Sequence, residues 1–166
     1  LGKDVSGATL GIVGLGAIGQ AVARRAGGFD MKVIGWTPSG RAVQGVDNVS
    51  LEELLLRSDF VSVHLALTSE TRNLLDAPRI ATMKPGAVLV NTARGGIVDE
   101  AALAAALDSG HLYAAGLDVF EREPVALDNP LLQHPRVVVV PHIGSATTLT
   151  RAKMVDIAVR NASAVL

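Results

Sequence analysis

The chain has 166 residues, 49% of them hydrophobic, which suits one well-buried domain and is too short for two ordinary ones. Its 15 Lys and Arg residues nearly balance 16 Asp and Glu residues, so no field would attract nucleic acid, and no apolar run approaches the roughly 20 residues of a membrane span. The lack of cysteine excludes disulfides, a thiolate nucleophile and a zinc–thiolate site, which fits a reducing compartment, and we expect a soluble cytoplasmic domain without a metal centre.

Short β-branched segments alternate with helical patterns along nearly the whole chain. We expect strands at residues 9–13, 32–36, 60–64, 87–91, 113–118 and 137–140. Most are apolar at consecutive positions, as is typical of parallel strands that helices cover on both faces. The sequence therefore predicts an α/β fold built on a doubly wound parallel sheet. Its buried core should contain Ile12, Val33, Ile34, Val61, Val63, Val88, Val90, Leu117, Val138 and Val140.

The first strand runs directly into the glycine-rich segment Gly14-Leu15-Gly16-Ala17-Ile18-Gly19, and a helix follows through about residue 25. In such a turn the first glycine permits the tight bend, the second lets a pyrophosphate approach, and the third allows close helix–strand packing. No Gly-Lys-Ser/Thr follows, which excludes a nucleotide-triphosphate loop. The motif alone also fits an ordinary turn, but this setting favours a Rossmann-like dinucleotide-binding domain over residues 1–166. The predicted contacts are Gly14, Gly16, Ala17, Ile18 and Gly19.

The end of the second strand bears on the choice between NAD(H) and NADP(H). A site for NAD usually has an acidic residue there, about 20 positions beyond the glycines, to bind the ribose 2′-hydroxyl. This sequence has none, and Thr37, Ser39 and Arg41 offer hydroxyls and a guanidinium that could accept a 2′-phosphate. The alternative is that Thr37 bonds the ribose of NAD and Arg41 is a solvated loop charge. The loop slightly favours NADP(H).

Start and stop signals mark the later helices. Ser50, with Glu53 three residues on, predicts a capping box, Asp99 predicts the N-cap of a helix over residues 100–108, and Gly110 predicts its stop. The last segment keeps one helical face apolar, so we expect it to pack against the domain. The residues of that face are Leu149, Ala152, Val155, Ala158, Val159, Ala162 and Val165.

Three polar residues follow predicted strand ends, the edge at which ligands of open parallel sheets bind. They are Arg94, Glu123 and His142. Singly, each has a plain structural explanation: a surface ion pair, a solvated carboxylate and a loop histidine bonded to backbone. Together they supply a guanidinium for a carboxylate, an imidazolium to protonate a new oxygen, and a carboxylate to hold the imidazole. This combination favours catalysis, with the reduction of a 2-keto acid as the chemistry that it fits.

At this point several spaced motifs can be compared with a known family. The glycine turn, Asn91-Thr92-Ala93-Arg94-Gly95, the segment from Gly116 to Pro124, and Pro141-His142-Ile143-Gly144 resemble the D-2-hydroxyacid dehydrogenase family. The resemblance covers nearly the whole chain, in the right order. It implies a hydride transfer between NAD(H) or NADP(H) and a small 2-hydroxy or 2-keto acid.

The resemblance also assigns roles to residues. Arg94 would bind the substrate, His142 would be the acid/base, and Glu123 would pair with it. Asp118 would contact the nicotinamide end, and His64 and Thr92 join the cofactor-binding residues.

Two departures from the family pattern are visible. Ala66 replaces a usual proline, and Thr37 replaces the aspartate of NAD-specific members. Glu123 disfavours the formate dehydrogenase branch, which generally has glutamine there. A corepressor-like dinucleotide sensor and a phosphite or formate dehydrogenase remain alternatives.

Members of this family are two-domain proteins of roughly twice this length, whose substrate domain is built from both chain ends. We therefore expect that the substrate domain is absent from this chain, that the chain alone has little or no turnover, and that the full-length protein is a homodimer. The missing lobe would close over the substrate and exclude water.

Overall fold

The computed structural model describes residues 2–165. Its strands are β1 (Thr9–Val13), β2 (Lys32–Trp36), β3 (Asp47–Asn48), β4 (Phe60–Val63), β5 (Val88–Asn91), β6 (Ala114–Leu117) and β7 (Val137–Val139). Its α-helices are α1 (Ala17–Ala26), α2 (Leu51–Arg57), α3 (Ala77–Thr82), α4 (Glu100–Asp108) and α5 (Thr148–Ser163). Three short 3-10 helices add to these: Gly27–Phe29, Gly95–Ile97 and Pro130–Leu132.

All seven strands form one parallel sheet in the order β3-β2-β1-β4-β5-β6-β7. The predicted α/β class and doubly wound sheet are confirmed. The strand order reverses between β1 and β4, which is where open α/β sheets bind their ligands, beyond the carboxyl ends of the strands. The two-residue strand β3 was not predicted, since it is too short to leave a hydrophobic pattern.

Local capping explains where α2 and α4 begin. The Ser50 hydroxyl accepts a hydrogen bond from the Glu53 backbone N–H at 3.0 Å, and the Asp99 carboxylate accepts one from Ala102 N–H at 3.0 Å. Helix α4 has the predicted bounds, and Gly110, just beyond its end, has φ +76°. Such side-chain acceptors satisfy N–H groups that lack partners in the first helical turn.

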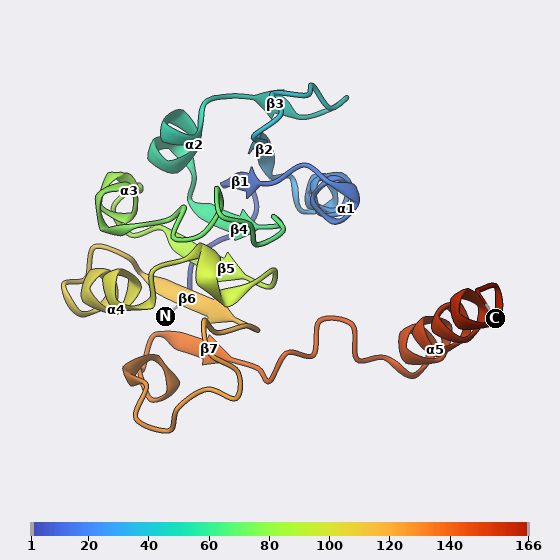
Figure 1. The fold of residues 1–166 in the computed structure, drawn as a ribbon. Helices are drawn as coiled ribbons and strands as arrows, with labels where there is room; N and C mark the ends of the chain where they lie inside the picture. The colour runs from blue at the N-terminus through green and yellow to red at the C-terminus, as the bar shows by residue number, and fades with distance from the viewer. Residues whose placement is uncertain (1, 166) are drawn as a thin grey trace.

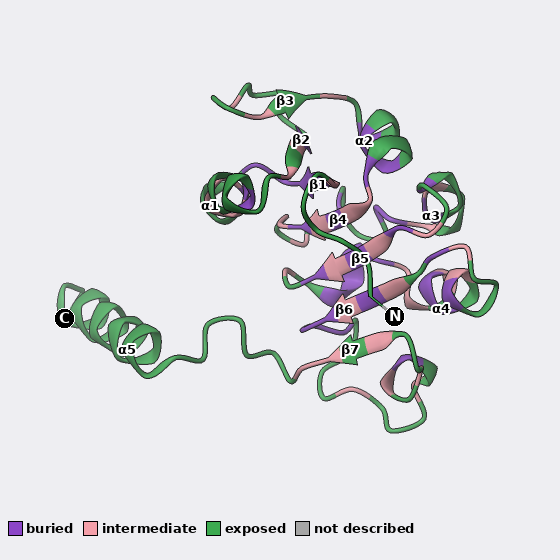
Figure 2. Ribbon diagram, turned by 180° about the vertical axis from the view of Figure 1, so that it is seen from behind, coloured by how far each residue is buried: buried purple, intermediate pink, exposed green. Residues whose placement is uncertain are grey.

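Helices cover the two faces of the sheet unequally. Figure 1 shows α2, α3 and α4 together on one face, and α1 alone on the other. The larger buried cluster lies between the sheet and α2 to α4, and a smaller one, including Ile12 and Ala23, lies beneath α1. Figure 2 shows the buried residues concentrated on the strands and on the inner sides of these helices.

This inequality corrects part of the predicted core. Ile12, Ile34, Val61, Val63 and Leu117 are buried as expected. The other five predicted residues are not fully buried: Val33, Val88, Val90 and Val140 are half-buried, and Val138 is 70% exposed. Alternate residues of a strand face opposite sides of the sheet, and no helix of the described chain covers β5 to β7 on the α1 side. For β5 to β7, the apolar runs therefore overestimated burial on the face that no described helix covers.

The prediction that the last segment packs against the domain is also wrong. Helix α5 forms, with the Thr147 hydroxyl accepting from Thr150 N–H at 3.2 Å, but every described residue of α5 is exposed. Figure 1 shows it standing away from the sheet at the end of an extended segment. An apolar face on a helix predicts that another surface covers it, but the sequence does not identify that surface. None of the helices within residues 2–165 is long and apolar enough to cross a membrane.

Candidate active site

The glycine turn lies at the carboxyl end of β1, where the strand order reverses. Gly14 has φ +106°, and a Cβ there would lie 2.7 Å from the His64 carbonyl oxygen. A Cβ on Gly19 would collide with the carbonyl oxygen of Gly14. Gly16, by contrast, is the N-cap residue of α1, and no side chain caps this helix. A Cβ on Gly16 would meet no atom within 4 Å. The turn is therefore tight against β4 and α1 but open above the helix N-terminus, the arrangement that a pyrophosphate needs.

The loop after β2 borders a cavity of its own. Gly40 N–H donates to the Thr37 carbonyl at 3.0 Å, and Arg41 N–H donates to the Ser39 hydroxyl at 3.4 Å. A cavity of about 280 Å³ lies between this loop and residues 48–50, with Trp36 and Thr37 in its wall. Ser39 and Arg41 are exposed beside it. These three predicted residues therefore share one loop next to the end of β2.

A second cavity, of about 520 Å³, brings together the ends of β4 and β5 and the first turn of α1. Four predicted site residues line it: Ile18, His64, Thr92 and Arg94. The His64 ring is partly buried, and its Nε2 lies 2.8 Å from the Ser62 hydroxyl. Burial lowers the pKa of His64 below its ordinary value. The ring therefore favours the neutral form.

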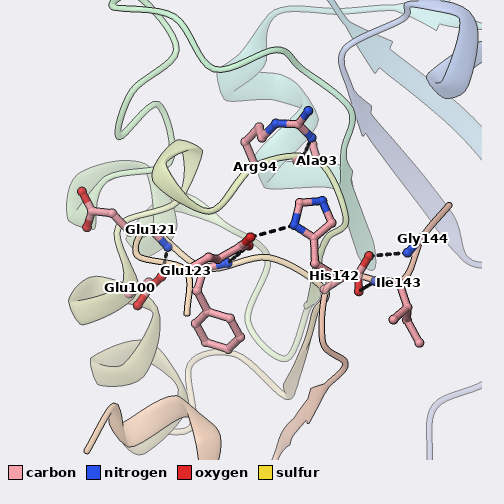
Figure 3. A network of polar contacts seen from close by, with 10 residues as sticks. Ala93, Arg94, Glu100, Glu121, Glu123, His142, Ile143 and Gly144 are labelled. Carbon is pink, nitrogen blue, oxygen red and sulfur yellow. Dashed lines mark hydrogen bonds and ion pairs between the residues drawn. The ribbon is translucent and has the colours of Figure 1, made fainter. Parts of the chain in front are cut away.

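Glu123 and His142 are in direct contact, as Figure 3 shows. His142 Nδ1 lies 2.7 Å from Glu123 Oε2, and Glu123 Oε1 accepts a hydrogen bond from Phe120 N–H at 3.1 Å. The hydrogen bond from His142 lowers the pKa of the Glu123 carboxyl, assisted by Phe120 N–H and by the charge of Arg94. The carboxylate thus fixes the ring from Nδ1 and leaves Nε2 free to exchange a proton with a ligand.

Arg94 lies on the same side of the sheet edge but does not pair with Glu123. Its Nη1 donates to the Ala93 carbonyl at 2.6 Å, and its side chain is exposed. Figure 3 shows the guanidinium above the His142 ring in that view. A guanidinium with most of its donors unused can form a bidentate contact with a carboxylate. Of the three predicted residues, Glu123 and His142 are in contact. Arg94 lines the cavity of about 520 Å³, and its charge acts on Glu123.

Sequence reasoning missed Asn91, which shapes the turn that carries Arg94. Its side-chain amide donates to the Arg94 carbonyl at 2.9 Å, and its Oδ1 accepts from Ala93 N–H at 3.1 Å. Asn91 is 1% exposed, so these bonds compensate for its burial. An asparagine at the end of an apolar strand was a visible signal, because a buried amide needs backbone partners.

Asp118 has contacts that the sequence did not predict. It is 3% exposed, and its two carboxylate oxygens accept hydrogen bonds from Ile143 N–H at 2.6 Å and Gly144 N–H at 2.7 Å. Its role toward the nicotinamide stays a prediction. The contacts present join the end of β6 to the loop that carries His142.

Comparison with protein families identifies the family of this chain. Residues 1–144 match the model described as "D-isomer specific 2-hydroxyacid dehydrogenase, NAD binding domain". The site residues Gly14 to Gly19, Arg94, Glu123 and His142 all fall within the matched range.

Curated relatives carry names from the same chemistry. The chain is 48% identical to a glyoxylate reductase of Korarchaeum cryptofilum, over 97% of this chain and 50% of the relative. It is 51% identical to a D-3-phosphoglycerate dehydrogenase of Mycobacterium tuberculosis, over 88% of this chain and 28% of the relative. It is also 51% identical to glyoxylate/hydroxypyruvate reductase B of Salmonella newport, over 96% and 51%. The chain thus spans about half, or less, of the length of the curated relatives it matches.

Solved structures agree with the fold. A TT0316 protein structure from Thermus thermophilus has a TM-score of 0.91 at 50% identity, over 96% of this chain and 50% of that one. An NAD-dependent formate dehydrogenase from Staphylococcus aureus, in complex with NAD, has a TM-score of 0.88 at 36% identity and covers 95% of this chain and 48% of that one. A D-isomer specific 2-hydroxyacid dehydrogenase from Xanthobacter autotrophicus, in complex with NADPH and MES, has a TM-score of 0.79 at 43% identity and covers 82% of this chain and 44% of that one. Structures similar to this chain thus include complexes with both dinucleotides.

Proposed function

The chain belongs to the D-isomer specific 2-hydroxyacid dehydrogenase family, as its NAD-binding domain, and on this premise we propose that it is the cofactor domain of a longer oxidoreductase. The enzyme would transfer a hydride between NAD(P)H and a D-2-hydroxy acid/2-keto acid pair. The observation that carries the proposal is the 2.7 Å contact between His142 Nδ1 and Glu123 Oε2, at the same sheet edge as the glycine turn. A histidine fixed by a carboxylate at one nitrogen is suited to acid/base work at the other.

The residues present fit a bound dinucleotide. The open space over Gly16 and the free N–H groups at the start of α1 would hold the pyrophosphate, and the nicotinamide, when bound, supplies or accepts the hydride. In the reducing direction, protonated His142 donates from Nε2 to the substrate oxygen. Glu123 keeps the ring oriented and stabilises its charge, while Arg94 grips the substrate carboxylate. In the oxidising direction the neutral ring accepts the proton.

Thr37, Ser39 and Arg41 support a preference for NADP(H) within this proposal. They stand where an acidic residue would bind the ribose of NAD, and Arg41 is exposed beside that loop. Calorimetric titration of the chain with NADH and NADPH tests the preference. Tighter binding of NADPH supports it, whereas a preference for NADH of more than about tenfold, or about 1.4 kcal/mol, overturns it. Failure of both to bind at about millimolar concentration would remove the cofactor assignment altogether.

The substrate is proposed to be of the glyoxylate, hydroxypyruvate or phosphoglycerate type, the chemistry in the names of the curated relatives. The test is turnover by the complete protein on these three acids, with formate and phosphite as comparison substrates. Turnover on a 2-keto or 2-hydroxy acid supports the proposal. Activity on formate or phosphite alone would assign another dehydrogenase branch, and binding without turnover on any of them would indicate a dinucleotide sensor.

A further inference from the structure

The backbone of His142 has an unusual conformation. Its φ is +53°, in the left-handed region that a residue with a Cβ rarely adopts. Such a conformation is strained and persists only where surrounding contacts hold it. The ring that contacts Glu123 is therefore aimed by a backbone that would relax if it were released.

Most of the contacts that hold this backbone go to one residue just beyond β6, although His142 N–H also lies 3.1 Å from the Val140 carbonyl oxygen. The Asp118 carbonyl accepts from His142 N–H at 2.9 Å, and its two carboxylate oxygens accept from the next two backbone N–H groups. Three consecutive N–H groups, of residues 142, 143 and 144, thus end on Asp118. Two of these bonds are to a buried charge, the stronger kind of hydrogen bond.

The other half of the pair is anchored to the same place. Glu123 Oε1 accepts from Phe120 N–H, only two residues beyond Asp118. Asp118 N–H itself donates to the carbonyl of Asn91 on β5 at 3.0 Å, so the point of attachment is part of the sheet edge. Both members of the Glu123–His142 pair are therefore held relative to the carboxyl end of β6.

We propose that Asp118 is a positioning residue for the reaction, which holds His142 in its left-handed backbone conformation and so keeps the imidazole against Glu123. This inference rests on the proposed function of His142 as the acid/base. It gives Asp118 a role in addition to the predicted contact with the nicotinamide, because each carboxylate oxygen accepts one bond from the loop and keeps a second lone pair. The role also explains Gly144, where a Cβ would lie 3.0 Å from Asp118 Oδ2 and would press the carboxylate away.

The test uses Asp118→Asn and Gly144→Ala in the complete enzyme. In Asp118→Asn the amide oxygen can still accept from one of the two backbone N–H groups, but the amide NH₂ faces the other and cannot accept from it. Gly144→Ala keeps the carboxylate and places a Cβ against Asp118 Oδ2. Both should lower kcat by about tenfold or more, because small displacements of reacting groups are costly. Gly144→Ala, which keeps the Asp118 carboxylate, should change the Kd for the dinucleotide by less than about twofold. Asp59→Asn serves as a stability control, since Asp59 accepts from Thr9 N–H at 2.9 Å near the start of β1.

The distinguishing readout is the titration of the Glu123 carboxyl, followed by ¹³C NMR. His142 lowers the pKa of this carboxyl, so displacement of the ring by either variant should raise the pKa toward its ordinary value. Arg94 and Phe120 N–H also lower it and should keep part of the shift. Asp59→Asn should leave the Glu123 titration and kcat unchanged, even though it lowers stability.

Each outcome bears on the inference. Loss of kcat with a raised Glu123 pKa supports it. Wild-type kcat in both variants, or a Glu123 titration that does not move in folded protein, overturns it. Weaker dinucleotide binding with an unmoved Glu123 titration would also overturn it and return Asp118 to the cofactor. If Asp118→Asn does not fold, Gly144→Ala decides. If the wild-type enzyme reduces no keto acid, the proposed function fails, and the Glu123 titration still shows whether Asp118 positions the ring.

Discussion

At the scale of single residues, the chemistry depends on what each polar group is bonded to. Glu123 is about two-fifths exposed, yet its carboxyl pKa is lowered because His142 and Phe120 N–H both bond to it. The same contact fixes the imidazole through Nδ1. The pair thus presents Nε2 of an oriented ring to a ligand.

His142→Ala in the complete enzyme should lower keto-acid reduction by about 10²-fold or more, since general acid catalysis contributes about 10²–10⁴-fold. Cofactor affinity should stay within about twofold, because the ring acts on the substrate oxygen. Steady-state kinetics and dinucleotide titration measure the two effects. Wild-type turnover by this variant would remove His142 from the mechanism.

Glu123→Gln should be milder than His142→Ala. The amide can still contact the ring at Nδ1, but it replaces a charged partner with a neutral one, so kcat/KM for keto-acid reduction should fall by less than in His142→Ala. Steady-state kinetics of the two variants and the wild type give the comparison. As a control, Glu52→Gln changes an exposed carboxylate at the start of α2 and should leave kcat/KM in place. Wild-type kcat/KM for Glu123→Gln would contradict the assigned pair.

His64 should make stability depend on pH. Its pKa is lower in the folded chain than its ordinary value of 6.5, so the unfolded chain binds the proton more readily. The stability that the neutral ring contributes is complete above about pH 6.5 and is lost as pH falls toward the folded pKa. Urea unfolding at about pH 7.5 and about pH 5 should therefore show a smaller loss in His64→Asn than in the wild type.

The control for His64 is Thr92→Ala, which changes another residue of the same cavity without a titrating group. It should show the same loss between the two pH values as the wild type. An equal loss in His64→Asn would show that the buried ring is not what the pH change affects. Asp59 and Glu123 do not confuse the comparison, because their lowered carboxyl pKa values place their contributions at more acid pH.

How far the site could be predicted is also decided residue by residue. The pairing of Glu123 with His142 could be expected because glutamate and histidine follow neighbouring strands, and such ends meet at one edge of a parallel sheet. The contacts of Asp118 could not be predicted, because they depend on the left-handed φ at His142, and the residue type does not indicate that conformation. Backbone partners of a side chain are invisible in a sequence unless they are local, as they are for Asn91.

At the scale of elements, the strands and caps were predictable because their signals are local. Apolar runs gave every strand of four or more residues to within one position at its ends, and the caps at Ser50 and Asp99 gave the starts of α2 and α4. Burial was predicted less well. Val88 and Val138 are as apolar as Val61, but the sequence does not state that one face of β5 to β7 lacks a covering helix.

Two glycines of the turn between β1 and α1 should differ in their roles, one in packing and the other in dinucleotide binding. In Gly19→Ala the Cβ would collide with the Gly14 carbonyl, so the free energy of unfolding should fall by about 1–3 kcal/mol and dinucleotide binding should weaken with it. In Gly16→Ala the Cβ meets no protein atom within 4 Å, so stability should stay within about 0.5 kcal/mol while dinucleotide affinity falls. Urea unfolding and calorimetry on both variants measure these effects. Unchanged affinity in Gly16→Ala would place the pyrophosphate elsewhere.

At the scale of the whole molecule, the sheet and α5 are different kinds of structure. The sheet has its own core, whereas α5 has 16 residues with none buried. Helices of about this length are marginal in water without tertiary contacts. Several large apolar side chains of α5, including Leu149, Val155 and Val159, are more than half exposed. The part of the chain that positions the site is therefore complete before α5 begins.

Ending the chain after Ala146 should leave the sheet intact. Because α5 covers none of the described core, the free energy of unfolding should change by less than about 0.5 kcal/mol, and dinucleotide affinity by less than about twofold. Ending it after Val140 is the matched comparison, because this also removes the backbone N–H groups that bond to the buried Asp118 carboxylate. That shorter chain should lose about 1–3 kcal/mol, the cost of an unsatisfied buried polar group. Urea unfolding of the three chains measures the difference. A large loss on removal of α5 alone would mean that its apolar face packs against the sheet in solution, and an equal stability of both truncated chains would mean that the loop around His142 does not hold Asp118.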